Sequence, residues 1–185
     1  MLQKFKTKEL IWISLVTALG FVFAIFTLMA STAVGNPALG GLMAMFLVPL
    51  LLALIYFPTK KIGSIILFGL IFSFLSVPTP MITQTPGFHK VPIILVAVII
   101  AEIIYFFVKK DKYKSILGGA GISVSLWIML LITFPILGLP AAERFLKMAT
   151  PLTFIAAILG AIGGYCGYFI YKKIENKSFV KQLQS

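Results

Sequence analysis

The chain has 185 residues, of which 60% are hydrophobic and only 11% are charged, and its mean hydropathy is +1.07. A soluble domain of this length needs far more polar surface, so the composition places the chain among membrane proteins. The net charge of +11 does not indicate a nucleic-acid partner, because the basic residues form short clusters between long apolar runs.

Six apolar runs approach the length of about 20 residues that a helix needs to cross a bilayer, within a range of about 17–25. We therefore expect an all-α membrane protein with one domain, residues 1–185, and six transmembrane helices: Leu10–Ala33, Ala38–Phe57, Ile62–Val77, Val91–Val108, Ile116–Leu137 and Leu152–Tyr171. The third run is the shortest, so the argument that it crosses the membrane depends most on the charges of the neighbouring loops.

Small residues mark two of these runs. The first run carries Ser14 and Ala18 at a four-residue spacing, which allows another helix to approach closely. This strip either packs inside the bundle or docks on another membrane subunit. The glycine-rich stretch Ala156–Tyr168 of the sixth run is interpreted as packing within the bundle, with a docking face as the alternative.

The basic residues alternate from loop to loop. Thirteen of the sixteen lie in the N-terminus, the second–third loop, the fourth–fifth loop and the C-terminal tail. The positive-inside rule then predicts that both termini are cytoplasmic. The alternation holds at every loop, which favours an even number of crossings and supports counting the third run.

The three connections on the other side, residues 31–41, 78–92 and 138–151, are rich in proline and polar residues. Proline fixes φ and removes a backbone donor, so these loops are expected to be stiff. They are either ordinary turns between helices or a lid over an external cavity. The trait is shared by all three loops, which favours the lid.

The sequence lacks the patterns of the common enzymes. No Gly-Lys pair occurs, which excludes a Walker A motif, and one histidine with five scattered acids predicts neither a zinc site nor a catalytic triad. We therefore expect no enzymatic activity, no metal and no cofactor. Binding, transport and assembly remain.

Two side chains are unusual for their positions within the apolar runs. Glu102 is the only acid inside an apolar run, where it has a structural, partner-facing or proton-relay role, although no second acid continues a relay. Trp127 lies near the middle of the fifth run, away from the interfaces that tryptophan prefers. It either stacks on a flat ligand or fills the core.

The six spans, the small residues of Ser14–Ala24 and the stretch Thr85–Tyr105 ("TPGFHKVPIILVAVIIAEIIY") together resemble the S-component of an energy-coupling-factor (ECF) vitamin transporter, over the whole chain. The resemblance implies capture of a vitamin-like small molecule at the outer face of a prokaryotic plasma membrane. It also implies partners, namely a transmembrane coupling subunit and two cytoplasmic ATPases. Docking would use the first helix, where Ser14 and Ala18 stand at the positions of the family's usual pair of alanines and Ser14 departs from that pattern.

On this reading, polar and aromatic residues near the outer loops are the candidates for substrate binding. Trp127 would stack on the solute, Arg144 and Lys147 would meet negative charge, and two amides would bond polar edges; the full set is Asn36, Gln84, His89, Trp127, Arg144 and Lys147. The alternative is a non-transporting membrane assembly protein of the rod-shape-determining type. A channel ranks last, because too few polar residues line the spans.

Overall fold

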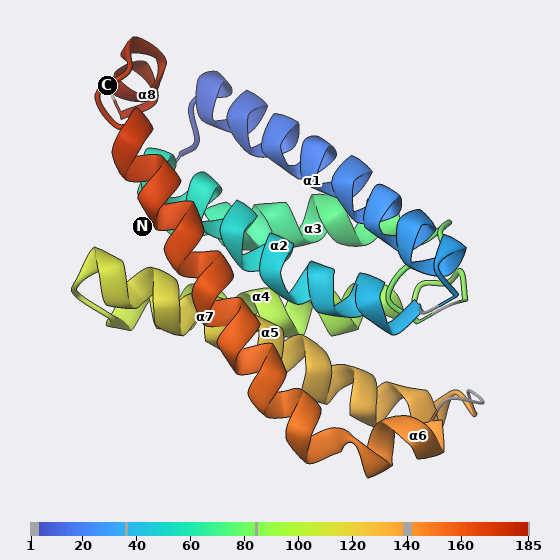
Figure 1. Cartoon of the computed structure of the whole chain (residues 1–185). Helices are drawn as coiled ribbons and strands as arrows, with labels where there is room; N and C mark the ends of the chain where they lie inside the picture. Colours follow the sequence, from blue (N-terminus) through green and yellow to red (C-terminus); the bar gives the residue numbers. More distant parts are fainter. Residues whose placement is uncertain (1–3, 36, 84, 139–141, 185) are drawn as a thin grey trace.

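The computed structural model describes residues 4–35, 37–83, 85–138 and 142–184, and the regular elements within them are all helices (Figure 1). In chain order they are α1 (Thr7–Ala33), α2 (Pro37–Thr59), α3 (Ser64–Ser76), α4 (Lys90–Phe107), α5 (Asp111–Ile136), α6 (Ala142–Lys147), α7 (Ala149–Ile174) and α8 (Ser178–Gln184). Each predicted apolar run coincides with one helix. The short helices α6 and α8 are additions that the sequence did not predict.

Among the described helices, α1, α2, α4, α5 and α7 are long and apolar enough to cross a membrane. The prediction of membrane-spanning helices is thus confirmed for five of the six runs. The remaining helix, α3, has 13 residues, which at 1.5 Å per residue gives about 20 Å. That is less than the roughly 30 Å of a bilayer's hydrocarbon core, so a crossing by α3 stays a prediction.

Much of the outer surface of the bundle is apolar. Large side chains are exposed along the long helices, such as Phe26 at 64%, Phe107 at 73% and Phe154 at 67%. Water would penalise this much exposed apolar surface, whereas lipid does not. The chain is accordingly a multi-pass membrane protein.

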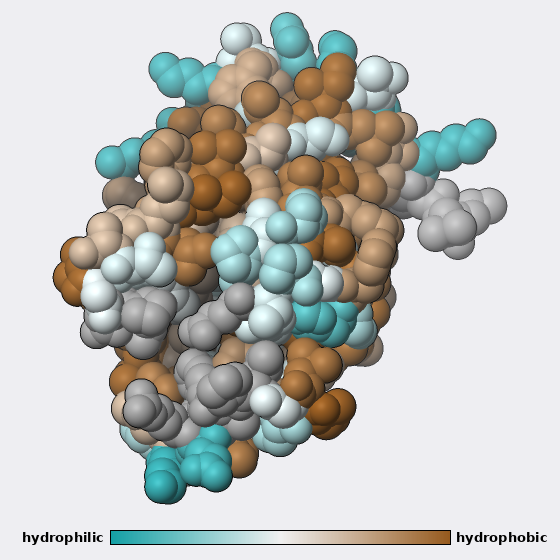
Figure 2. Space-filling view, turned by 90° about the vertical axis from the view of Figure 1, so that its right-hand side faces the viewer, coloured by the Kyte–Doolittle hydropathy of each residue, from teal (hydrophilic) through white to brown (hydrophobic). Residues whose placement is uncertain are grey.

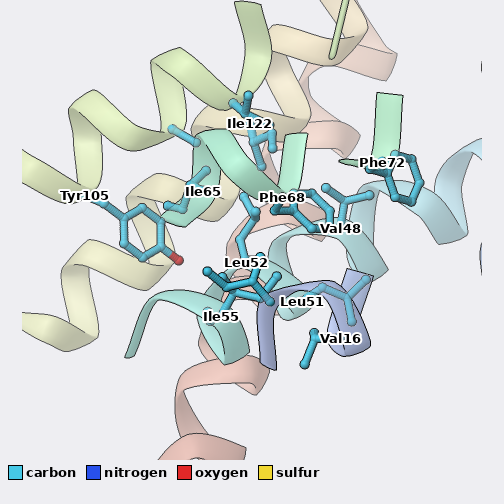
Figure 3. Close-up of a cluster of buried hydrophobic side chains, with 14 of the residues drawn as sticks. Val16, Val48, Leu51, Leu52, Ile55, Ile65, Phe68, Phe72, Tyr105 and Ile122 are labelled. Atoms are coloured by element: carbon cyan, nitrogen blue, oxygen red, sulfur yellow. The ribbon is translucent and has the colours of Figure 1, made fainter. Parts of the chain in front are cut away.

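The core lies around α2, which contacts α1, α3, α5, α7 and α8. Figure 3 shows its main cluster, in which Leu52 and Ile55 of α2 meet Ile65 and Phe68 of α3 and Ile122 of α5. These five side chains are at most 1% exposed. The short helix α3 is therefore an integral part of the core, although it is too short to span a bilayer by itself.

Glycines of α7 let this helix lie directly against the backbones of two neighbours. A Cβ atom at Gly160 would collide with the carbonyl oxygen of Gly119 in α5, and one at Gly163 would collide with the carbonyl oxygen of Phe46 in α2. The interpretation of the glycine-rich stretch as packing within the bundle is confirmed, because its small residues face α5 and α2.

The start of α1 and the C-terminal helix α8 lie at the same end of the bundle, on the left of Figure 1. The Trp12 ring of α1 lies 5.3 Å from the Phe179 ring of α8, and Lys61 in the α2–α3 loop forms a 2.7 Å ion pair with Glu9. Lys114, just after the α4–α5 loop, donates to the hydroxyl of Tyr56 near the end of α2. We call this the basic end, because it gathers the lysines of four segments: 4–8, 60–61, 109–114 and 172–181.

Candidate functional site

The end of the bundle away from α8 is formed, among the described residues, by the C-terminal end of α1, residues 77–83 and 85–89, the end of α5, and α6. We call it the opposite end. Figure 2 looks onto this end and shows a pale-to-teal patch of polar residues bordered by brown apolar ones. Apart from the termini, this is where a polar ligand would find hydrogen-bonding groups, because the sides of the bundle are apolar.

Residues 77–89 fold back onto the bundle instead of projecting from it. The loop is closed by the Gly87 amide, which donates to the Val77 carbonyl at 2.9 Å. Met81 is 6% exposed and belongs to the main core cluster, and Thr83 is fully buried. Ile82 between them has a φ of +71°, a conformation that a β-branched residue adopts only at a cost in energy. The surrounding contacts therefore hold this loop in one arrangement.

His89, at the end of this loop, contacts Thr83. Its Nε2 lies 2.7 Å from the Thr83 hydroxyl, which itself donates to the Thr85 carbonyl at 3.2 Å. Because the hydroxyl proton of Thr83 is donated to the Thr85 carbonyl, the hydroxyl oxygen accepts from His89. The neutral imidazole therefore carries its proton on Nε2 and donates it to Thr83. Partial burial, and secondly the charge of Lys90, lower the pKa of His89 below its usual value, so the ring is neutral at pH 7.

Glu102, the one acid within an apolar run, caps the N-terminus of α3. Its carboxylate accepts hydrogen bonds from the backbone amides of Gly63 at 2.9 Å, Ile65 at 3.1 Å and Ile66 at 3.3 Å. The first amides of a helix have no partner within the helix, and the positive end of the helix dipole favours a carboxylate. Glu102 is only 7% exposed. Of the three roles left open by the sequence, the structural one accounts for this geometry.

Lys90 caps the C-terminal end of α3. Its ammonium group is fully buried and donates to the carbonyl oxygen of Ser76 at 2.9 Å and to that of Thr79. Carbonyls at a helix C-terminus lack partners and carry partial negative charge, so a cation satisfies both needs. Lys90 therefore contributes to the fold and is not available to an anionic solute.

Trp127 is 3% exposed and forms a small core cluster with Met45 of α2 and Ala156 of α7. Its indole nitrogen donates to the Ala149 carbonyl at 3.4 Å. This placement corresponds to core filling, the second of the two interpretations.

The remaining candidates are placed to different degrees. Lys147 is exposed at the last residue of α6, and Arg144 lies in the same helix with its side chain outside the described part of the structure. Asn36 and Gln84 lie outside the described residues. Sequence reasoning missed Thr83, whose buried hydroxyl contacts His89.

On α1, Ser14 and Ala18 are exposed and face away from the bundle. They lie among exposed apolar neighbours, including Leu15 at 52% and Leu19 at 51%. The first helix thus leaves Ser14 and Ala18 accessible to another helix, whereas its small residues Gly20 and Ala24 are buried in the bundle.

No family model, curated protein or solved structure matches the chain. The resemblance described above therefore depends on the arrangement of spans, loops and charges.

Proposed function

We propose that the chain captures a vitamin-like small solute at the opposite end and acts as the substrate-binding subunit of an ATP-driven importer of the ECF type. In this proposal the bundle crosses a prokaryotic plasma membrane six times, with both termini in the cytoplasm. A transmembrane coupling subunit and two ATPases on separate chains supply the energy.

The observation that carries the proposal is the difference in height between α1 and α3 at the opposite end. The two helices begin at nearly the same level, since Lys61, three residues before α3, pairs with Glu9 in the first turn of α1. They run the same way, but α1 has 27 residues and α3 has 13, or about 40 Å against about 20 Å. Residues 77–89 fill the space above α3 and bring the polar pair Thr83 and His89 to it. In this proposal the small solute binds to these polar groups, beside the longer helix α1.

The capping of α3 supports a sixth crossing. Unsatisfied backbone groups within a bilayer cost several kcal/mol each. Glu102 and Lys90 lower that cost at the two ends of α3, which supports the proposal that this helix and its flanking loops form one crossing. The lysines of the basic end support a cytoplasmic location for the termini.

The absence of a nucleotide-binding motif from the sequence supports a separate source of energy. The exposed strip of Ser14 and Ala18 on α1 is the proposed contact with the coupling subunit. An assembly protein that binds no solute would use the same strip to contact its partners. A solute-binding measurement is therefore needed to distinguish the transport function from the assembly function.

The experiment is to purify the full chain in mild detergent, identify retained small molecules by mass spectrometry, and titrate the protein with a panel of B-group vitamins by calorimetry. We expect sub-micromolar binding of one compound. Thr83→Val, which removes the hydroxyl that contacts His89 but keeps the side chain's shape, should weaken binding about tenfold. The matched control is Thr17→Val in α1, where the hydroxyl bonds only within its own helix, to Ile13.

Equal weakening by the two valine variants would place the binding site away from residues 77–89. If no compound is retained and none binds, the solute-capture function is wrong, and co-purification with a cell-wall synthesis protein would favour the assembly function.

A further inference from the structure

A groove of about 220 Å³ lies at the basic end, between the first turns of α1 and the C-terminal helix α8. Figure 1 shows α8 folded beside the start of α1. The wall of the groove is largely apolar and includes Ile11, Trp12, Leu15, Phe179 and Leu183. Trp12 is held in place because its indole nitrogen donates to the Leu54 carbonyl at 3.0 Å.

One cation stands at the rim of this groove. Lys8 lines it and is exposed. The nearest acid in sequence, Glu9, is 2% exposed and paired with Lys61. Glu175, shortly before α8, forms an ion pair with Lys172. The acids of this region are thus engaged with other lysines, and the rim of the groove is positive.

We propose that this groove binds one anionic phospholipid, with an acyl chain against Ile11 and Leu15 and the headgroup phosphate at Lys8. The arrangement of the groove matches the two parts of such a molecule, because an apolar wall on the membrane-spanning helix α1 adjoins a cation at its first turn. Lysines next to a membrane surface attract anionic lipids, and tryptophan prefers the depth of the headgroups.

The short helix α8, near the C-terminus, forms the second wall of the groove. Val180 is fully buried and Leu183 is 6% exposed, whereas Lys177 and Lys181 are exposed. α8 therefore fixes its apolar side on the bundle, and Phe179, 40% exposed, is left to face the groove. A short helix with this division of apolar and basic residues suits the membrane surface.

The test uses the fluorescence of Trp12. Trp127→Phe leaves Trp12 as the only tryptophan of the chain. The protein is reconstituted in phosphatidylcholine vesicles that contain equal mole fractions of either brominated phosphatidylglycerol or brominated phosphatidylcholine, both of which quench indole on contact. We expect quenching at about fivefold lower mole fraction of the anionic lipid, a preference that one lysine near the surface supplies. Lys8→Gln should abolish the preference, whereas Lys109→Gln, with the same change of charge in the α4–α5 loop, should keep it.

Equal quenching by both lipids, or a preference that survives Lys8→Gln, would overturn the proposal. Protection of Trp12 from both lipids would overturn it too and would indicate a protein occupant, such as a second copy of the chain. If Trp127→Phe does not fold, native mass spectrometry of the unsubstituted chain and of Lys8→Gln decides the matter, by retention of phosphatidylglycerol over phosphatidylcholine in the first and loss of that difference in the second.

Discussion

Replacing Glu102 by glutamine tests the cap on α3. The change keeps the shape of the side chain but removes its charge and turns one oxygen into an amide donor. In the structure Oε1 accepts from Gly63, and Oε2 accepts from both Ile65 and Ile66. Whichever oxygen is lost, at least one buried N–H loses its acceptor, at a cost of about 1–3 kcal/mol, and the remaining bonds lose their charge assistance. We expect the free energy of unfolding to fall by about 2–4 kcal/mol.

The assay is reversible unfolding of the purified protein by sodium dodecyl sulfate in mixed micelles, combined with amide hydrogen exchange. Exchange should accelerate at the start of α3 and stay unchanged at the start of α5, which Glu102 does not cap. Glu175→Gln is the control, because this acid lies at the protein surface in an exposed pair and its loss should leave stability nearly unchanged. Wild-type stability and exchange in Glu102→Gln would refute the capping role.

Three further changes test other parts of the structure. Lys90→Met keeps the length of a buried side chain but removes the charged donor to the Thr79 carbonyl, whereas the Ser76 carbonyl still accepts from the amide and hydroxyl of Thr79. Unfolding in the same detergent assay should therefore be easier by about 1–3 kcal/mol. Gly160→Ala places a methyl group against the backbone of Gly119 and should destabilise the bundle by about 1–3 kcal/mol, whereas Gly41→Ala, which meets open space, should not. His89 binds its proton less tightly in the folded state than in the unfolded one, so stability should fall as the pH drops from about 6.5 through the lower folded pKa. Melting curves between pH 5 and about 7.5 should show this dependence in the wild type and not in His89→Gln.

Hydropathy predicted all six core helices, because each presents an apolar run long enough to be distinct from its neighbours. Hydropathy predicted the ends of these helices less accurately where a helix continues beyond its apolar run into polar residues. The fifth run was expected to begin at Ile116, but α5 begins at Asp111, since its first turn is polar and still helical. Helix α8 was missed for a related reason. Its apolar residues are too few to form a run, and they gain stability only by packing on the bundle.

The role of Glu102 was not accessible from the sequence, since its partners lie 36 to 39 residues away in the chain. Two weak signals pointed toward it. The third run was the shortest of the six, and its start, Gly63 followed by Ser64, had no acid within its first turn. A short helix that lacks its own cap needs a polar group from a neighbour, and only the adjacent helix carried an acid inside an apolar run. The same reasoning identifies Lys90 at the opposite end of α3.

The spacing of these two residues explains why they act on one helix. Lys90 and Glu102 are twelve residues apart on α4, about 18 Å at 1.5 Å per residue, which is close to the length of about 20 Å for α3. Each charge bonds to backbone groups of the sign that the helix dipole requires there. Both side chains therefore hold α3 against α4. An acid inside an apolar run, or a lysine at its edge, commonly suggests ion or solute binding. Here the charges of Glu102 and Lys90 bond to backbone groups of α3. A solute at the opposite end would therefore have to bind to the neutral groups of the loop before α4, such as Thr83 and His89, or to the cations of α6.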